Sequence, residues 1–210
     1  MKHLSEKFGL PENEEEFWSY CLGCLDNIAT IYNIRNTALP EINIFNFITS
    51  KQNPNYFNAW KVSDSKSFFE LCLVSYEIVY FTASHTGGHK HTDSHLYFFG
   101  HLNLTTDFGN ALIRPETLED KITELFDSVE IDFKTYPKFS KKYFVLAENK
   151  DDFAKLLKPE LIQYIQNIEG LQIEFKNNNC IFRLGKAVDE RESMQLCEIG
   201  LTLDGLLNNR

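Results

Sequence analysis

The stretch SFFELCLVSYEIVYFT (67–82), followed by HTGGHKHTDSH (85–95) and HLYFFGHLNLT (95–105), decides the fold of this chain. The two flanking runs alternate in polarity and are rich in β-branched and aromatic residues, a pattern that predicts two β-strands. Between them, Gly87-Gly88 marks a turn region. We therefore expect a long antiparallel hairpin with the histidines at its tip.

Outside this hairpin, the chain predicts helices and further strands in mixed order. The expected elements are an amphipathic helix at 12–33, a strand and a loop within 36–54, a short helix at Leu118–Phe126, strands at Val129–Phe133 and Tyr143–Ala147, a helix capped near Asn149, a hairpin of Leu171–Lys176 and Cys180–Leu184 across Asn177–Asn179, and a final helix at Glu190–Leu207. Pro159 falls inside an apolar helical pattern, so it should kink that helix or begin a second one. The expected fold class is α+β: an antiparallel sheet with packed helices, among them N-terminal and C-terminal amphipathic helices, in a single domain over residues 1–210.

Composition narrows the classes of partner. The chain has 18 Phe and 9 Tyr in 210 residues, which favours a β-rich interior because aromatic side chains pack well on pleated surfaces. Its net charge of −9 would repel phosphate backbones. We therefore expect no nucleic-acid partner.

Three features of the sequence predict where the protein is located. No run approaches the roughly 18 uninterrupted apolar residues of a membrane-spanning helix. The N-terminus lacks the apolar core and cleavage site of a signal peptide. The five cysteines form an odd number without framework spacing, which fits reduced, mostly buried thiols. We expect a soluble cytoplasmic protein without a transmembrane segment.

About half of the chain carries motifs in a recognisable order. These are FFGHLNL (98–104), VEIDF (129–133), FSKKYFV (139–145), AKLLKPEL (154–161), IEF (173–175) and NCI (179–181). Over Phe98 to Leu184 this order resembles an uncharacterised bacterial family, known only as a domain of unknown function, whose members commonly carry two N-terminal transmembrane helices. The transmembrane pair is absent from this sequence, and the histidine segment is an addition to the family pattern. The resemblance implies a fold but no activity and no site residues.

The histidine segment is the main candidate site. His89, His91, Asp93 and His95 are two residues apart, so on a strand they would share one face, about 7 Å between successive α-carbons. Such a row spreads its donors, although a loop could bend them together and His85 could join from the opposing strand. Imidazole and carboxylate suit a divalent transition metal such as zinc. The alternatives are a solvated polar tip and a tip that responds to pH.

The other candidate motifs favour structural roles. Cys21-Leu-Gly-Cys24 has the spacing of a redox dithiol but falls in the middle of a predicted helix, which favours core packing. His101 follows Gly100 in an apolar strand and is expected to be a hydrogen-bonded strand residue. The sequence contains no nucleophile elbow and no phosphate-binding loop, so no catalytic residues are predicted.

Together these patterns predict a non-enzymatic domain that works through interaction with a protein or a small ligand. The alternative is a metal-binding protein that uses His85, His89, His91 and His95, with Asp93 as a fifth donor or as a partner of the histidines. A further alternative is a metal-dependent hydrolase, because only the histidine segment could hold an activated water. Bound metal would separate the last two hypotheses from the first.

Overall fold

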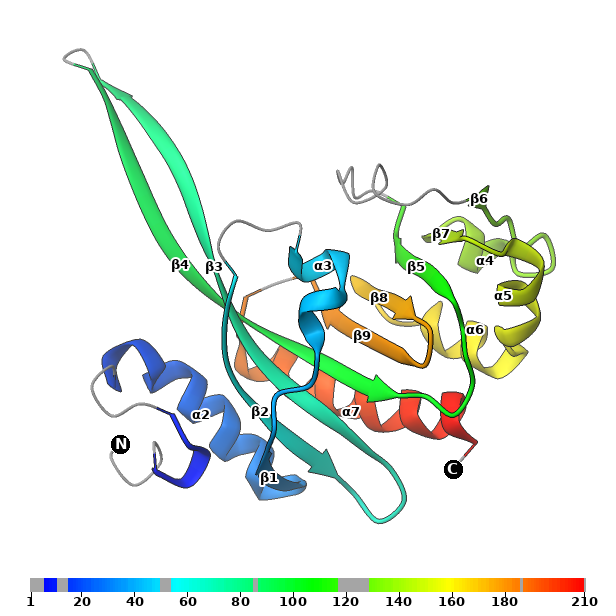
Figure 1. Cartoon of the computed structure of the whole chain (residues 1–210), viewed down its shortest axis with the longest axis horizontal. Coiled ribbons are helices and arrows are strands. Elements are labelled where there is room, and N and C mark those ends of the chain that lie inside the picture. Colours follow the sequence, from blue (N-terminus) through cyan, green and yellow to red (C-terminus); the bar gives the residue numbers. More distant parts are fainter. Residues whose placement is uncertain are drawn as a thin grey trace.

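Among the residues that the structure describes, a nine-stranded antiparallel sheet organises the molecule, in the order β1-β2-β3-β4-β9-β8-β5-β7-β6 (Figure 1). The computed structural model describes residues 6–10, 15–49, 54–84, 87–116, 129–185 and 187–209. The strands are β1 (Asn33–Thr37), β2 (Asn55–Ser63), β3 (Phe68–Ser84), β4 (Gly87–Asn103), β5 (Asn110–Pro115), β6 (Val129–Glu130), β7 (Tyr143–Ala147), β8 (Leu171–Lys176) and β9 (Asn179–Leu184). The two strands predicted first, β3 and β4, are the longest and lie next to each other within the sheet.

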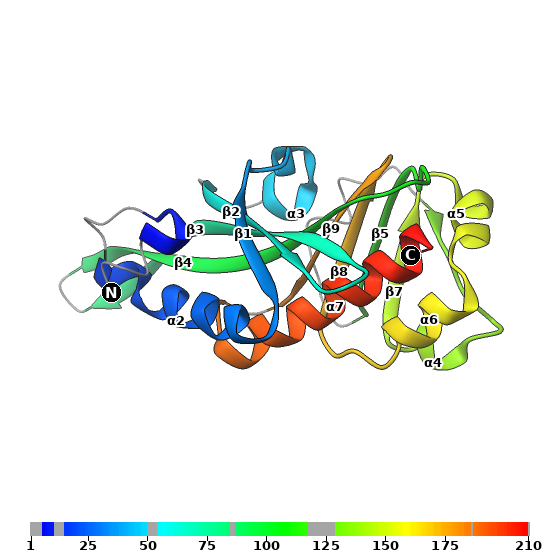
Figure 2. The same cartoon turned by 90° about the horizontal axis from the view of Figure 1, so that it is seen from below.

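Helices cover the two faces of the sheet unequally. They are α2 (Glu15–Ile31), the 3₁₀ turn η2 (Ile42–Ile44), α3 (Asn46–Thr49), α4 (Pro137–Ser140), α5 (Lys150–Leu156), α6 (Pro159–Ile165) and α7 (Glu190–Asn208). The long helices α2 and α7 lie on one face, and the short α3 lies on the other (Figure 2). This arrangement confirms the α+β prediction, including its N-terminal and C-terminal helices. In the described part of the chain, no helix combines the length and apolar character needed to cross a membrane.

Within the described residues, two apolar clusters hold these layers together. The larger one lies between the sheet and the helices α2 and α7, and it includes Trp18, Trp60 and Phe182, each fully buried. The smaller one lies under η2 and α3 and includes Phe45 and Phe99. The expected β-rich, aromatic interior is therefore present on both faces of the sheet.

The segment 36–54 differs from its prediction. Its apolar residues alternate as in a strand, but they form η2 and α3, and the strand of this region is β1. The buried carboxylate of Glu174 on β8 accepts hydrogen bonds from the backbone N–H groups of Asn46 and Phe47, each at 2.7 Å. These two donors would otherwise lack partners at the start of a helix, so a contact from a distant strand selects helix over strand.

Local signals in the last third of the chain are confirmed. The side chain of Asn149 accepts a hydrogen bond from the backbone N–H of Asp152 and caps α5. Pro159 begins the separate helix α6, and Asn177 has a φ of 53° in the turn between β8 and β9. The predicted strand at Val129–Phe133 is shorter than expected, since β6 ends at Glu130. The helix predicted at Leu118–Phe126 lies outside the described residues, and the single domain over 1–210 stays a prediction.

Candidate functional site

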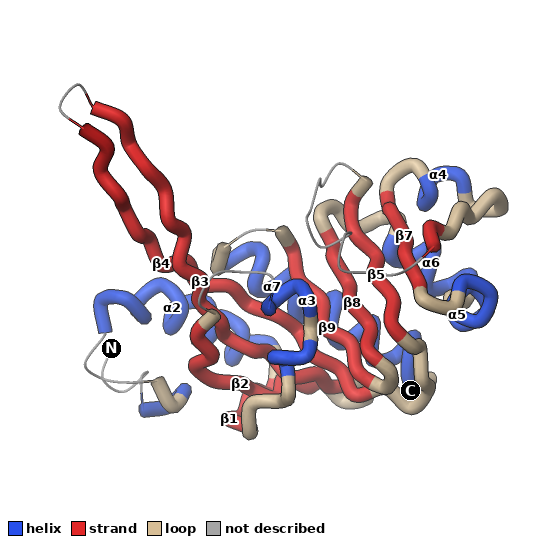
Figure 3. Tube along the Cα trace, turned by 45° about the horizontal axis from the view of Figure 1, so that its top comes forward, coloured by secondary structure: helices blue, strands red, loops and turns tan. Residues whose placement is uncertain are grey.

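The hairpin of β3 and β4 extends past the rest of the sheet as an arm, defined here as Tyr76–Ser84 and Gly87–His95 (Figures 1 and 3). Pairing of β3 with β2 ends at Ser75, and pairing of β4 with β9 begins at Gly100. Nine residues of each strand therefore pair only with each other among the described residues. At the usual rise of a strand, the arm is about 30 Å long.

The described histidines of the segment, His89, His91 and His95, lie along this arm rather than at its tip. The register pairs Tyr76 with His95, Tyr80 with His91 and Thr82 with His89. His89, His91, Asp93 and His95 therefore alternate along β4 and share one face, as the spacing predicts for a strand. The expected tip position is wrong because β4 begins at Gly87 and already contains these residues. His85 lies outside the described residues.

Side chains of β3 contact the histidine face of β4 across the arm. The imidazole of His91 stacks on the ring of Tyr80, with centroids 5.1 Å apart and planes 15° from parallel. Its Nε2 lies 2.9 Å from Oγ1 of Thr82. A hydrogen bond to Asp93, with help from the charge of that carboxylate, raises the pKa of Tyr80. His91 and Asp93 of the row thus contact side chains of β3, although most residues of the row are exposed.

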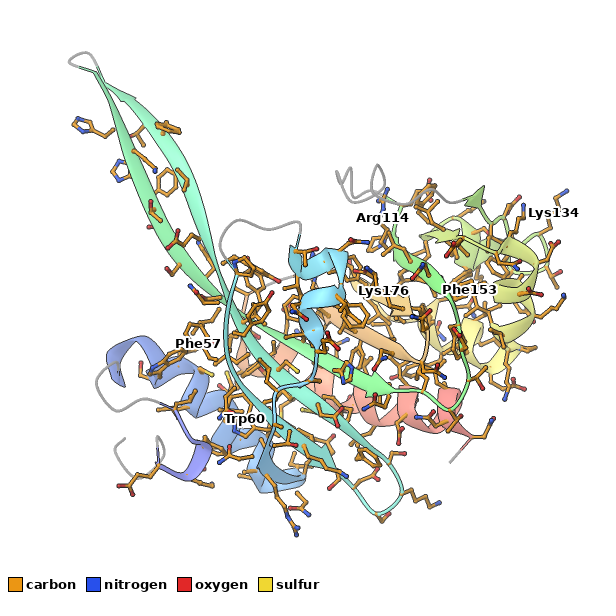
Figure 4. The ribbon with its side chains drawn as sticks, in the orientation of Figure 1. Phe57, Trp60, Arg114, Lys134, Phe153 and Lys176 are labelled. Carbon is orange, nitrogen blue, oxygen red and sulfur yellow. The ribbon has the colours of Figure 1, made fainter. Side chains whose placement is uncertain are left out.

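Large apolar side chains are exposed on both faces of the arm. Phe81 is 73% exposed and Tyr80 is 42% exposed. Because successive residues of a strand point to opposite sides, these two rings project from opposite faces of the ribbon. Figure 4 shows side chains extending from both strands of the arm into space where no other described element lies. The arm is therefore a ribbon with aromatic surface on either side.

The described residues contain no group of three or more His, Cys, Asp or Glu that could hold a metal ion. The row on β4 places its donors in line, about 7 Å apart at the α-carbons, and its neighbours on β3 are Tyr, Ile and Thr. Within one copy of the arm, the geometry supplies pairs of neighbouring donors.

The remaining sequence candidates have structural roles, as predicted. His101 is 2% exposed, and its ring nitrogens lie 3.1 Å from a carboxylate oxygen of Glu70 and 3.3 Å from Oδ1 of Asn179. Cys21 and Cys24 are buried in the larger apolar cluster. Burial raises the pKa of both thiols. This is the opposite of what a reactive dithiol requires.

Sequence reasoning missed a buried polar row on the face that carries α3. Nε of Arg183 donates a 2.8 Å hydrogen bond to Oε1 of Gln172, and its guanidinium lies over the rings of Phe47 and Phe99 at 5.2 and 5.6 Å. On β5, which pairs with the Gln172 strand β8, the Arg114 guanidinium lies 4.8 Å from the centre of the Phe144 ring. Single arginines in apolar strands carry no spacing signal. These contacts join β9 to β8 and β4, and β5 to β7.

In the described part of the chain, a cavity of about 1130 Å³ lies at the start of α7. Its lining includes Glu169, Gln172, Asp189, Arg191 and Glu192. Asp189 also caps α7 by accepting hydrogen bonds from the backbone N–H groups of Arg191 and Glu192. Asp189 is thus committed to the helix start, and the described lining brings together no Ser or Cys nucleophile with a base.

No family model, curated protein or solved structure matches this chain. The resemblance to the bacterial family therefore stays a prediction, carried by the quoted motifs alone.

Proposed function

We propose that this protein is a non-enzymatic interaction domain and that its arm is the element that binds a protein partner. The observation that carries this proposal is the exposure of Phe81, at 73%, on a ribbon that pairs with no third strand among the described residues. An isolated two-stranded ribbon is marginally stable in water, because neither face is covered. Contact with a partner would cover the aromatic rings and stabilise the ribbon.

The shape of the arm favours a protein over a small ligand. Small ligands bind in concave sites that enclose most of their surface, whereas the arm is a protruding ribbon. Both of its edges also present backbone N–H and C=O groups, which can pair with an added strand. The net charge of −9 supports a partner other than nucleic acid.

A photo-crosslinking amino acid in place of Phe81 tests this proposal in cells that make the chain at its natural level. The matched control places the same amino acid at Lys134, an exposed position at the far end of the molecule from the arm (Figure 4). We expect a discrete adduct from position 81 that is absent from position 134. Excess unlabelled chain should compete the adduct away, while excess Phe81→Ser chain should not. Equal labelling from both positions would overturn the proposal.

The cysteines support a cytoplasmic location, which we propose alongside the interaction function. All five are free thiols and all five are buried, namely Cys21, Cys24, Cys72, Cys180 and Cys197. Proteins of oxidising compartments commonly use cysteines in disulfides instead.

A hydrolase, the remaining hypothesis, would need three donors beside an open coordination position, and the described residues contain no such group.

A further inference from the structure

We propose that the partner of the arm is a second copy of this chain, and that one divalent transition-metal ion such as zinc joins the two arms through His89 and His91 of each copy. This inference rests on the proposed function, since it takes the arm as the binding element. It goes further by naming the partner, the ligand and the residues that hold it.

The first step is that His89 and His91 form half of a metal site. They are two residues apart on β4 and share a face, with about 7 Å between their α-carbons. Thr82 is the register partner of His89, yet its hydroxyl contacts Nε2 of His91 at 2.9 Å. This diagonal contact places His91 Nε2 beside the register partner of His89. Imidazoles at this spacing can tilt onto one ion at the usual zinc–nitrogen distance of about 2.0–2.1 Å.

The second step is that the other half comes from outside the chain. Zinc prefers four donors in a tetrahedron. The described residues contain no group of three or more His, Cys, Asp or Glu that could hold a metal, so the pair on β4 has no further donors there to complete a site. A two-fold axis between two arms brings the same surface of a second copy into contact and supplies an identical pair of imidazoles. The ion would then replace the Thr82 hydroxyl as the partner of His91 Nε2.

The third step is that the arms would need the ion. A two-fold axis at the His89–His91 pair overlaps the two ribbons only near their ends, where Tyr80, 42% exposed, would face the partner's row. Stable protein interfaces bury roughly 1,200–2,000 Å² in total, more than a few rungs of a ribbon can provide. Each copy also carries a net charge of −9, which opposes association. A shared cation offsets both deficits, so the dimer should depend on metal.

Sedimentation velocity and native mass spectrometry of the untagged full chain test the inference, first without metal and then with zinc added in steps. We expect a monomer without metal and a dimer with one zinc ion per two chains, complete at half an equivalent of zinc. The variant His89→Ala with His91→Ala should bind zinc at least ten-fold more weakly and stay monomeric. The control, Lys90→Ala with Thr92→Ala, changes the opposite face of the same strand and should dimerise like the wild type.

Three results would overturn the inference: one zinc held per monomer, a zinc dimer that survives loss of both histidines, or no zinc binding. Thermal unfolding without metal should give the same midpoint for both double variants, because all four residues are exposed on the arm. The same photo-crosslinking amino acid in place of Tyr80, which lies on the face of the histidine pair, separates this inference from the proposed function. An adduct with twice the mass of the 24.5 kDa chain supports both. An adduct containing only a different protein supports the arm as a binding element but overturns self-association.

Discussion

Replacing Gly100 by alanine should destabilise the protein, because the ring of Phe182 occupies the space that a side chain would need. Gly100 on β4 pairs with Phe182 on β9, where the arm strand joins the body of the sheet. A β-carbon at Gly100 would lie 2.0 Å from Cζ and 2.3 Å from Cε2 of that ring. Carbon atoms in favourable contact are about 3.5–4.0 Å apart, so one of the two strands would have to shift.

The expected cost of Gly100→Ala follows from this overlap. Phe182 is fully buried, so its ring cannot move into solvent. Overpacking a core typically costs about 1–3 kcal/mol. Replacing a strand glycine returns roughly 0.5–1 kcal/mol of backbone entropy, so we expect a net loss near 1–2 kcal/mol. For a chain of this size, each kcal/mol lowers the melting temperature by about 2–4 °C.

Urea unfolding followed by tryptophan fluorescence would measure this loss. Gly88→Ala is the matched control on the same strand, since its nearest contact would be a backbone oxygen at 3.9 Å. Phe182→Leu should destabilise the wild type but cost less, or restore stability, in the Gly100→Ala background, because it removes the clashing ring. Equal stability of Gly100→Ala and wild type, or strict additivity of the two substitutions, would refute the reasoning.

Two further predictions concern buried groups. Desolvation raises the pKa of Glu174 above its ordinary value of 4.5 despite its two backbone donors. The contribution of Glu174 to stability is therefore complete below pH 4.5 and is lost as the pH rises through the raised pKa. In urea unfolding, the stability advantage of wild type over Glu174→Gln should shrink between pH 4.5 and 7. An advantage that grows with pH would contradict this. Burial raises the pKa of all five cysteine thiols. A thiol-reactive disulfide reagent at pH 8 should therefore label no cysteine in the folded chain and five in denaturant. Rapid labelling of the folded chain would show that a thiol is open to solvent.

Sequence reasoning succeeded where the deciding interactions are local. Pro159 cannot continue a helix, Asn149 offers an oxygen to the next turn, and Asn177 tolerates positive φ, so each places a boundary without help from the rest of the fold. It failed in the segment 36–54, where the alternation of apolar residues matches a strand. There the outcome depends on the carboxylate of Glu174, far away in sequence, which satisfies the first donors of α3.

In the arm, sequence reasoning was right about one feature and wrong about another. A period of two was enough to place His89, His91, Asp93 and His95 on one face, but the same polar residues and Gly87-Gly88 indicated a turn. The residues of β4 that lie in the arm are mostly polar and bury little apolar surface, so β4 extends there because β3 supplies a complete backbone ladder. This arrangement leaves Phe81 exposed instead of covered. The arm therefore exposes a row of metal donors and uncovered aromatic rings at its surface. A second molecule could bind these groups and cover the rings.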